Sequence, residues 1–324
     1  MKAVIVAEGG SSAGLGHISR CLSLAGALAA RDVAVGFAVW GNDRAFDLIR
    51  SEGYEVHASS DGVVSPGFVE TMRPDVIVAD SYSLPSRHLE ALQGISPLVV
   101  IDDLADRFLP ADIVVNSAPH APGLKYRALP GTRFLLGPEY AILWSEFAEL
   151  PLRRIEGKVR RILVTMGGGD PLNLTPRAVR AIRSVLGDVH IDAVIGPFFE
   201  MGRGLPVEEA MLHVTPKSLY GLMAGTDLAV TGGGQTTYEL AATGTPAVVV
   251  TVADNQVPQV TAWESLGVLK YVGDAHIPST LERMGTEVHR LAADQEVRKG
   301  MSARGRKAVD GRGAERVADA MLRG

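Results

Sequence analysis

Short runs of β-branched and other apolar residues recur along the first half of the chain, without strict alternation of apolar and polar positions. They lie at residues 3–7, 33–39, 76–79, 98–101 and 113–115. Such runs are typical of strands that are covered on both faces, and the helix-length stretches between several of them suit the crossovers of a parallel sheet. The first half of the chain is therefore predicted to be an α/β unit.

The clearest helical pattern follows the first glycine-rich loop. Apolar positions at helical spacing give this helix one face composed of Ile18, Cys21, Leu22, Ala25, Leu28 and Ala29. The spacing predicts a helix that packs on the sheet directly after the first strand.

The second half of the chain restates the opening order of strand, glycine-rich loop and helix. A strand is predicted at residues 161–166 and a helix from about Leu174 to Leu186. Further strands are predicted at residues 191–195, 228–231 and 248–252. Two similar α/β units that face one another are the simplest architecture.

Residues 144–157 combine proline, glycine and charge, which is typical of an interdomain connection. We place the domain boundary near Pro151, so that the predicted domains are residues 1–150 and 151–310. The tail from about Thr280 to Arg323 has helical spacing and predicts two or three helices. The last of them, at residues 311–324, is a candidate to pack back on the first domain.

Composition and charge exclude several classes of protein. The 324 residues suffice for two domains of about 150 residues each, and 46% hydrophobic with 21% charged residues argues against disorder and coiled coil. A formal charge of −5 provides no basic field for nucleic acid or an anionic membrane. Cys21 is the only cysteine, which argues against a secretory location, and we expect the cytoplasm. The apolar run at residues 247–253 is far shorter than the ~20 residues of a membrane span.

Three glycine-rich loops follow predicted strands, at residues 9–17, 167–173 and 232–239. Backbone N–H groups and helix N-termini bind anions together, and glycine allows a ligand to approach the backbone closely. No Gly-Lys-Ser/Thr follows any of these loops, so a P-loop is absent.

The first loop also matches two other motifs incompletely. Gly14-Leu-Gly16 begins a dinucleotide fingerprint, but its third glycine would fall at Ser19. The segment from Gly10 to Gly14 matches a nucleophile elbow, yet the elbow needs its serine at the strand-to-helix turn, whereas the helical face begins only at Ile18. Neither motif is favoured.

His17 lies at the predicted N-terminus of a helix and at the carboxyl end of the first strand, where clefts in open α/β sheets form. A helix N-terminus disfavours the imidazolium and keeps the ring available as a general base. The alternative, that His17 only helps to cap the helix, is equally compatible with the residues alone.

The third loop also has two interpretations. Thr236 and Glu239 have the spacing of a capping box, in which the glutamate only satisfies the N-cap amide. Alternatively, residues 232–237 cradle a diphosphate while the Glu239 carboxylate binds a ribose diol. Asp170 and Asn173 of the second loop are expected to cap the helix that follows them.

A metal site is not expected. The eight histidines are scattered, with no His-Glu-x-x-His and no clustered cysteine and histidine set. Asp102 and Asp103 are the nearest candidate for a cation site, but they are more readily explained as caps of the following turn or as groups that order a cleft.

Taken together, these motifs resemble one family. The resemblance is carried by Gly14-Leu-Gly-His17-Ile-Ser-Arg20, Asp80-Ser-Tyr82, Ile101-Asp-Asp103, Leu136-Gly-Pro-Glu-Tyr-Ala-Ile-Leu143, Met166-Gly-Gly-Gly-Asp170-Pro-Leu-Asn173, Gly232-Gly-Gly-Gln-Thr-Thr-Tyr-Glu239 and Asp254-Asn-Gln256. These segments occur in the order seen in the UDP-2,4-diacetamido-2,4,6-trideoxy-β-L-altropyranose hydrolases of pseudaminic acid biosynthesis and in related spore-coat polysaccharide proteins. The residues from 232 to 252 are also similar to the nucleotide-binding half of the N-acetylglucosaminyltransferase that completes lipid II.

The resemblance implies a GT-B-like α/β fold, with two Rossmann-like domains whose parallel sheets face a central cleft and with UDP mainly on the second domain. His17 matches the family's proposed base, Tyr82 its cleft tyrosine, and Asn255 its asparagine near the diphosphate and the reacting sugar. Glu239 matches its ribose carboxylate. The other nucleotide-binding positions implied are Gly16, Gly167, Gly168, Gly233, Gly234, Gln235, Thr236, Thr237 and Gln256.

The reaction implied is metal-independent, inverting hydrolysis of a UDP-linked 2,4-diacetamido-2,4,6-trideoxyhexose, with His17 as base for the attack of water on the anomeric carbon. UDP is part of this substrate, so no separate cofactor is expected, and a monomer is compatible with the sequence. Two alternatives are an inverting UDP-sugar glycosyltransferase of the same fold and a nucleotide-sugar binding protein.

The chain also departs from the family pattern in its first half. Val6-Ala-Glu8 stands where the family usually has Arg-x-Asp, Tyr82-Ser83 where it has Tyr-Gly, and Trp144 where an arginine is frequent. These departures leave the implied UDP site intact and leave the identity of the sugar open.

Overall fold

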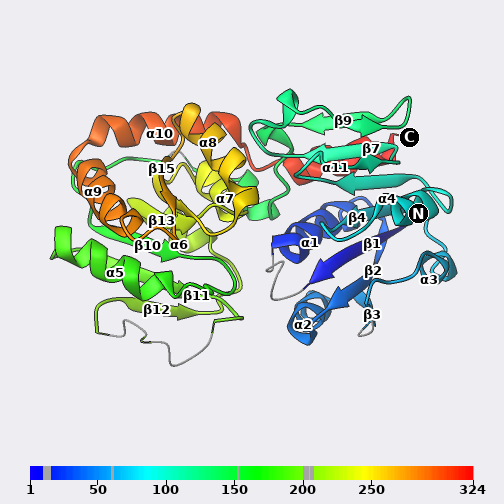
Figure 1. Cartoon of the computed structure of the whole chain (residues 1–324), viewed down its shortest axis with the longest axis horizontal. Helices are drawn as coiled ribbons and strands as arrows, with labels where there is room; N and C mark the ends of the chain where they lie inside the picture. Colours follow the sequence, from blue (N-terminus) through cyan, green and yellow to red (C-terminus); the bar gives the residue numbers. More distant parts are fainter. Residues whose placement is uncertain (10–15, 60–61, 152, 200–203, 205–207, 324) are drawn as a thin grey trace. The chain divides into compact units, whose positions relative to one another are not determined.

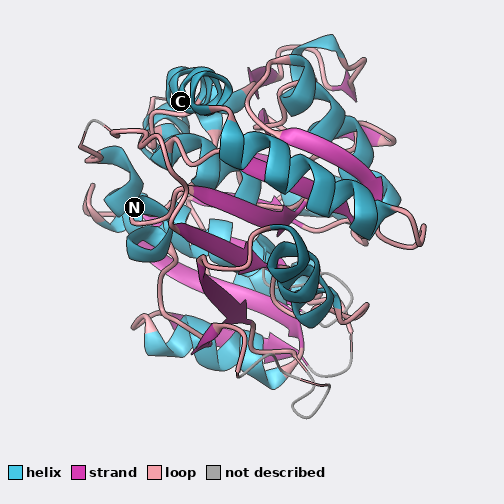
Figure 2. Ribbon diagram, turned by 90° about the vertical axis from the view of Figure 1, so that its left-hand side faces the viewer, coloured by secondary structure: helices cyan, strands magenta, loops and turns pink. Residues whose placement is uncertain are grey.

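The computed structural model describes residues 1–9, 16–59, 62–151, 153–199, 204 and 208–323. The chain divides into two compact units. Unit 1 comprises Met1–Ser145 and Gly311–Gly324, and unit 2 comprises Glu146–Asp310. Figure 1 colours the elements in chain order, and Figure 2 distinguishes helices from strands.

Unit 1 contains a seven-stranded parallel sheet in the order β3-β2-β1-β4-β5-β7-β9. The strands are β1 (Lys2–Gly9), β2 (Ala34–Gly41), β3 (Glu55–Ser59), β4 (Val76–Asp80), β5 (Leu98–Ile101), β7 (Ile113–Asn116) and β9 (Arg133–Leu136). The helices are α1 (Gly16–Ala29), α2 (Asp43–Ser51), α3 (Pro66–Thr71), α4 (Ser86–Gln93) and α11 (Gly313–Leu322), with short 3-10 turns η1 (Ala121–Gly123) and η2 (Pro138–Tyr140). A small separate sheet pairs β6 (Phe108–Leu109) with β8 (Arg127–Ala128).

Both faces of the unit 1 sheet are buried, as the apolar runs predict. Along β1, Ile5 and its alternate neighbours belong to a core cluster shared with α1, α2 and α11. Val4 and Val6 point to the other face, into a cluster shared with α3 and α4. A strand with cores on both sides cannot alternate apolar and polar residues, which explains its continuous apolar sequence.

Helix α1 is more deeply buried than its sequence predicts. The predicted apolar face of α1 is buried except for Ala29, which is exposed at the end of the helix. Leu24 lies outside the expected face and is nevertheless buried, since α11 packs against α1. Arg31 also donates to Asp319 at 2.7 Å, and the red α11 lies among the elements of unit 1 in Figure 1.

Unit 2 contains a six-stranded parallel sheet in the order β12-β11-β10-β13-β14-β15. The strands are β10 (Arg161–Thr165), β11 (His190–Ile195), β12 (Met211–Val214), β13 (Leu228–Gly232), β14 (Ala247–Thr251) and β15 (Lys270–Asp274). The helices are α5 (Leu174–Val185), α6 (Tyr220–Ala224), α7 (Thr236–Thr243), α8 (Val257–Ser265), α9 (Thr280–Ala293) and α10 (Gln295–Ala308), with 3-10 turns η3 (Ser145–Ala148) and η4 (Asp254–Gln256). Two parallel-sheet units of α/β class are thus confirmed.

Candidate active site

Polar side chains gather at the carboxyl edge of the unit 1 sheet, where β1, β4 and β5 are direct neighbours. Asp80 is the last residue of β4, and Asp102 and Asp103 follow β5. Helix α1 begins at Gly16 just beyond β1, which brings His17 and Arg20 from its first turns to the same edge. Strand order therefore assembles residues that lie far apart in the sequence.

His17 and Arg20 both bond to the carboxylate of Asp80. His17 Nδ1 lies 2.5 Å from Asp80 Oδ1, while Arg20 donates from Nε to Oδ2 and from Nη2 to Oδ1, each at 2.6 Å. The Asp80 side chain is fully buried, and those of His17 and Arg20 are nearly so. The three residues form one buried, charge-assisted cluster.

The charge of Asp80 fixes the tautomer of His17. Burial alone would raise the pKa of Asp80, but the Arg20 guanidinium and His17 lower it well below its usual range. An ionised carboxylate only accepts hydrogen bonds, so His17 Nδ1 carries the ring proton and donates it. In the neutral ring Nε2 then holds the lone pair, and no described residue donates to it. This nitrogen is available as a proton acceptor.

Tyr82, two residues after the end of β4, contacts the cluster through its hydroxyl and its ring. Its hydroxyl donates to Asp103 Oδ2 at 2.8 Å, and the same carboxylate accepts from Arg20 Nη1 at 2.9 Å. The Tyr82 ring meets the His17 ring edge to face, with centroids 4.6 Å apart. Partial burial and the Asp103 carboxylate raise the pKa of Tyr82 well above its usual range, so the phenol remains neutral.

Asp102 and Asp103 make different contacts. Asp102 Oδ1 accepts from the amides of Leu104 and Ala105, which caps the turn as predicted. Asp103 accepts hydrogen bonds from both Arg20 and Tyr82. Among the residues that the structure describes, no group of three or more His, Cys, Asp or Glu side chains could hold a metal ion.

In unit 2, the second glycine-rich loop connects β10 to α5. Gly167 has φ of +82°, a backbone conformation that favours glycine. Asp170 accepts from the amides of Leu174 at 2.7 Å and Thr175 at 2.8 Å, so it caps α5 as predicted. The side chain of Asn173, the N-cap residue, makes no capping hydrogen bond within the described residues, so that part of the prediction is wrong. The Gly168 carbonyl accepts from the Phe198 amide at 2.8 Å, which ties the loop to the segment after β11.

The third glycine-rich loop connects β13, the neighbour of β10, to α7. A Cβ at Gly233 would lie 2.8 Å from Val260 Cγ1 and 3.1 Å from Gln256 Cβ, so only glycine lets α8 pack this closely. Gln259 donates to the Gly233 carbonyl at 3.0 Å and to Thr237 Oγ1 at 3.1 Å. These bonds leave the start of α7 at the carboxyl edge of the sheet, where an anion can meet its N-terminus.

The capping-box interpretation of Glu239 is not supported. Helix α7 begins at Thr236 with Gln235 as its N-cap, and within the described residues no side chain makes the capping hydrogen bond. Glu239 is partly buried, and its carboxylate has no hydrogen bond to a described residue. Burial and the carboxylate of Glu146 raise the pKa of Glu239 to about 7. A carboxylate of this kind lacks hydrogen-bond donors, which a diol would supply.

The predicted residues thus fall into two groups. His17 and Tyr82 meet in unit 1, where Gly16 starts α1. The remaining predicted positions lie in unit 2, where Gln256 accepts from the Val252 amide at 2.9 Å and Asn255 is exposed on η4. The segment 10–15, which holds the match to a nucleophile elbow, lies outside the described residues.

Arg20 and Asp80 of the unit 1 cluster were not assigned a site role from the sequence, and Asp103 was considered only as a cation ligand, a cap or a group that orders a cleft. All three stand inside the motifs that carry the family resemblance. Their contacts span 60 to 83 residues of sequence, and the signal that points to them is their position at the carboxyl ends of β4 and β5 or one helical turn after His17.

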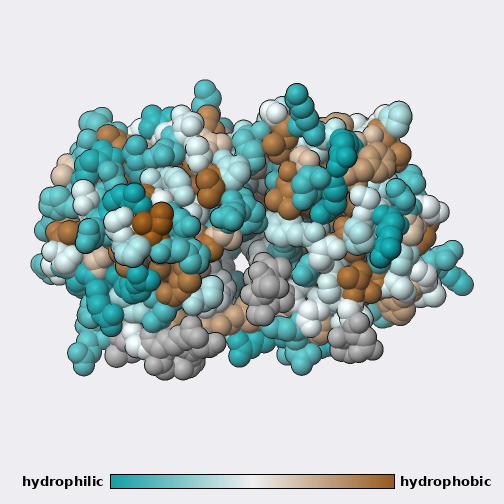
Figure 3. All heavy atoms as spheres, viewed as in Figure 1, coloured by the Kyte–Doolittle hydropathy of each residue, from teal (hydrophilic) through white to brown (hydrophobic). Residues whose placement is uncertain are grey.

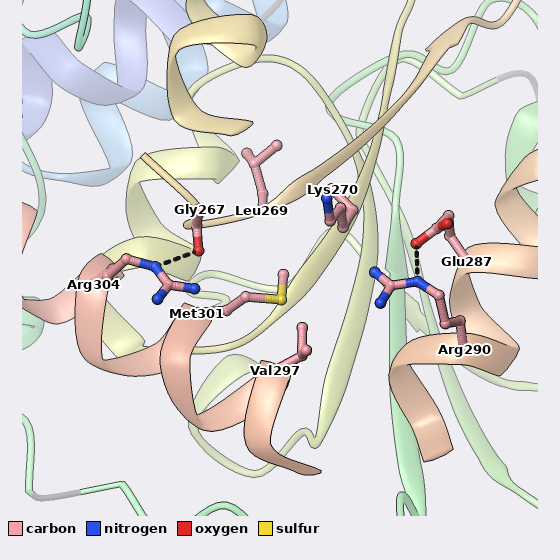
Figure 4. Close-up of a pocket in the computed structure, with 8 residues that line it drawn as sticks. All are labelled: Gly267, Leu269, Lys270, Glu287, Arg290, Val297, Met301 and Arg304. Atoms are coloured by element: carbon pink, nitrogen blue, oxygen red, sulfur yellow. Dashed lines mark hydrogen bonds and ion pairs between the residues drawn. The ribbon is translucent and has the colours of Figure 1, made fainter. Parts of the chain in front are cut away.

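A separate cavity of about 420 Å³ lies at the amino end of strand β15 in unit 2, beside the first residue of this strand (Figure 4). Leu269, Val297 and Met301 supply its apolar lining. Two of its cations are already engaged, since Arg290 pairs with Glu287 at 2.8 Å and Arg304 donates to the Gly267 carbonyl at 2.9 Å. None of the predicted site residues lines it.

On the face shown in Figure 3, apolar residues occur in small groups among hydrophilic ones. No helix in the described part of the chain is long and apolar enough to cross a membrane.

Three sequence relatives are found at modest identity. The spore coat polysaccharide biosynthesis protein SpsG of Bacillus subtilis is 24% identical over 97% of this chain and 95% of its own length. A Helicobacter pylori protein named pseudaminic acid cytidylyltransferase and UDP-2,4-diacetamido-2,4,6-trideoxy-beta-L-altropyranose hydrolase is 27% identical over 60% of this chain and 37% of its own length. The uncharacterized protein MJ1062 of Methanocaldococcus jannaschii is 27% identical over 77% of this chain and 55% of its own length. The chain thus spans about half the length of MJ1062 and less of the H. pylori protein. No family model matches the chain.

Solved structures establish the fold. MurG of Acinetobacter baumannii superposes with a TM-score of 0.68 at 14% identity, covering 100% of both chains. The spinosyn forosaminyltransferase SpnP gives a TM-score of 0.69 at 13% identity over 100% of this chain and 98% of its own. The chain therefore has the GT-B fold of glycosyltransferases. The sequence relatives confirm the resemblance to the UDP-sugar hydrolases and spore-coat polysaccharide proteins.

Proposed function

We propose that the protein hydrolyses a UDP-linked 2,4-diacetamido-2,4,6-trideoxyhexose to UDP and the free sugar, with inversion at the anomeric carbon. The observation that carries the proposal is the cluster of His17, Asp80 and Arg20. It directs His17 Nδ1 to Asp80 and leaves Nε2 without a described donor at the carboxyl edge of the sheet. Sequence relatives named for a UDP-sugar hydrolase and for polysaccharide biosynthesis support the choice of substrate.

In the proposed reaction His17 Nε2 takes a proton from water while the water oxygen bonds to the anomeric carbon. The bond from this carbon to the UDP oxygen breaks, and UDP leaves with the electron pair. Before the step, Arg20, Asp80 and Asp103 together carry one net negative charge. Protonation of His17 makes the cluster neutral, so Asp80 stabilises the imidazolium that forms.

The nucleotide is assigned to unit 2 because its two glycine loops lie on neighbouring strands. The start of α7 at Thr236 and Thr237 faces the diphosphate and takes up the charge that develops on the leaving group. Glu239 accepts from the ribose diol, and Asn255 contacts the diphosphate and the sugar. This scheme needs no metal and no cofactor apart from the UDP that belongs to the substrate.

A second candidate function is inverting glycosyl transfer from a UDP-sugar. The GT-B glycosyltransferases of similar structure favour it, and one of them was solved with thymidine diphosphate. His17 would then deprotonate an acceptor hydroxyl in place of water. The two reactions differ in whether UDP is released without an acceptor.

The deciding experiment measures UDP release from a panel of UDP-2,4-diacetamido-trideoxyhexoses and from UDP-GlcNAc, in chelator, with and without acceptors. NMR of the sugar product reports its configuration. Acceptor-independent release of an inverted free sugar is the expected result, and release only with an acceptor would identify a transferase. His17→Ala is expected to lower turnover by about 10²-fold or more. His57→Ala, on the edge strand β3, is the matched control and is expected to keep it.

A further inference from the structure

The segment from Ser81 to Ser83, which carries Tyr82 out of β4, is held by side chains on both sides. Glu8 Oε2 accepts from the Ser81 hydroxyl at 2.7 Å and from the Ser83 hydroxyl at 2.8 Å. The Ser83 amide donates to Ser81 Oγ at 2.9 Å, which closes a tight turn around Tyr82. One oxygen of Glu8 thus anchors both residues that flank Tyr82.

Arg107 holds the carbonyl groups of the same segment. It donates to the Ser81 carbonyl at 2.9 Å and to the Tyr82 carbonyl at 3.1 Å. Arg107 also lies 3.4 Å from Asp102, whose other oxygen caps the turn next to Asp103. The backbone of Tyr82 and the carboxylate that binds its hydroxyl are therefore supported by one connected set of contacts.

Tyr82 needs this support because packing does not hold it. The residue keeps 36% of its surface exposed, although its side chain contacts His17 and Asp103. A partly exposed ring on a loop samples several rotamers unless its backbone is fixed. The contacts at Ser81 and Ser83 therefore decide whether Tyr82 stays against His17.

We propose that Glu8 is a positioning residue, which holds Tyr82 against His17 through its hydrogen bonds to Ser81 and Ser83. The proposal rests on the proposed function, in which His17 is the base. Glu8 and Ser83 stand at two of the positions where the chain departs from the family pattern, and the structure bonds them to each other at 2.8 Å. The two residues that depart from the family pattern therefore act together on the segment that carries Tyr82.

The proposal separates the acceptor role of Glu8 from its charge. A glutamine oxygen can accept both serine hydroxyls, so Glu8→Gln is expected to keep most of the activity. Glu8→Met removes the acceptor at similar length and is expected to lower kcat/KM by about tenfold or more, because a small displacement of a positioned group is costly. Ser86→Ala, which removes a comparable 2.7 Å bond to the Phe108 carbonyl outside the site, is the matched control.

The first measurement is 19F NMR of the free protein with 3-fluorotyrosine, the Tyr82 signal being assigned with Tyr82→Phe. We expect this signal to move toward the value of a solvent-exposed tyrosine in Glu8→Met, and to stay in place in Glu8→Gln and Ser86→Ala. This readout needs no substrate, so it tests the positioning of Tyr82 even if the protein releases no UDP. An unchanged signal in Glu8→Met would overturn the proposal.

The second measurement is a double-mutant cycle in kcat/KM between Glu8→Met and Tyr82→Ala, which removes the ring that contacts His17. If Glu8 acts through Tyr82, the two losses are not additive. Additive losses, or a Glu8→Gln protein as impaired as Glu8→Met, would show that Glu8 acts by its charge or on the substrate directly, and would refute the proposal. Ser83→Ala removes one of the two bonds at the loop and provides the same test should Glu8→Met fail to fold.

Discussion

Asparagine in place of Asp80 keeps the shape of the side chain but turns one acceptor into a donor. At the Oδ2 position the amide would oppose Arg20 Nε, which now donates there at 2.6 Å. At the Oδ1 position it would oppose Arg20 Nη2 and force His17 Nδ1 to accept, which moves the ring proton to Nε2. Both arrangements remove the charge that pairs with the imidazolium.

Asp80→Asn is expected to lower both the turnover and the stability of the protein. Loss of a correctly oriented general base costs about 10²- to 10⁴-fold in kcat, whereas affinity for UDP should hold because its proposed contacts lie in unit 2. Removing one partner of a buried ion pair destabilises by about 3–5 kcal/mol. We expect the lower end, about 3 kcal/mol, because Arg20 remains paired with Asp103 at 2.9 Å.

The loss of stability in Asp80→Asn should also depend on pH. The pKa of Asp80 is lowered in the folded protein, so its contribution is complete above the pKa of an unfolded aspartate, about 3.9, and is lost as pH falls toward the folded pKa. The difference in unfolding free energy between wild type and Asp80→Asn is therefore expected to shrink below about pH 4.

Urea unfolding and steady-state UDP release, measured where each protein remains folded, test both parts. Asp192→Asn is the matched control, because Asp192 is also fully buried and bonds to Arg161 at 2.5 Å and to His213 at 2.7 Å. This control should lose stability but keep turnover. A folded Asp80→Asn protein with wild-type turnover would refute the reasoning about the tautomer.

Two further predictions concern unit 2. The pKa of Glu239 is raised to about 7, and hydrogen bonds from a ribose diol favour its ionised form, so UDP affinity should rise as pH increases through 7. Calorimetry should find proton release when UDP binds, and Glu239→Gln should remove this pH dependence. Arg298 is fully buried and donates to the carbonyl groups of Glu156, Gly157 and Leu291. Arg298→Met removes these hydrogen bonds, leaves the carbonyls of Glu156 and Gly157 without a described donor, and should destabilise the protein by about 3 kcal/mol or more in urea unfolding. An unchanged midpoint would contradict this assignment.

The sequence predicts the inner strands of both sheets and misses the outer ones. The four strands at the sheet edges, β3, β9, β12 and β15, were not predicted. Edge strands are half-exposed and include polar residues such as Glu55, Arg133 and Lys270, so they lack the continuous apolar run that marks a strand buried on both faces. Strand prediction from apolar runs succeeds here only where two cores meet.

The candidate site shows the same division between local and long-range information. The position of His17 at a helix start follows from the adjacent glycines and the helical face that begins at Ile18. Its partner Asp80 lies 63 residues away, and the pairing depends on β4 lying beside β1, which no local pattern encodes. The support of Tyr82 by Glu8 spans 73 to 75 residues and is equally invisible to spacing.

The return of α11 to unit 1 makes unit 2 an insertion within unit 1. During synthesis, unit 2 is a continuous segment that can fold as soon as it has emerged, since domains generally fold as units. Unit 1 can complete its core only after α11 has been synthesised, because Val317, Ala318 and Met321 of α11 belong to the core cluster that covers α1. The helix that carries His17 therefore gains its full apolar cover only after the UDP-binding half of the proposed enzyme has been made.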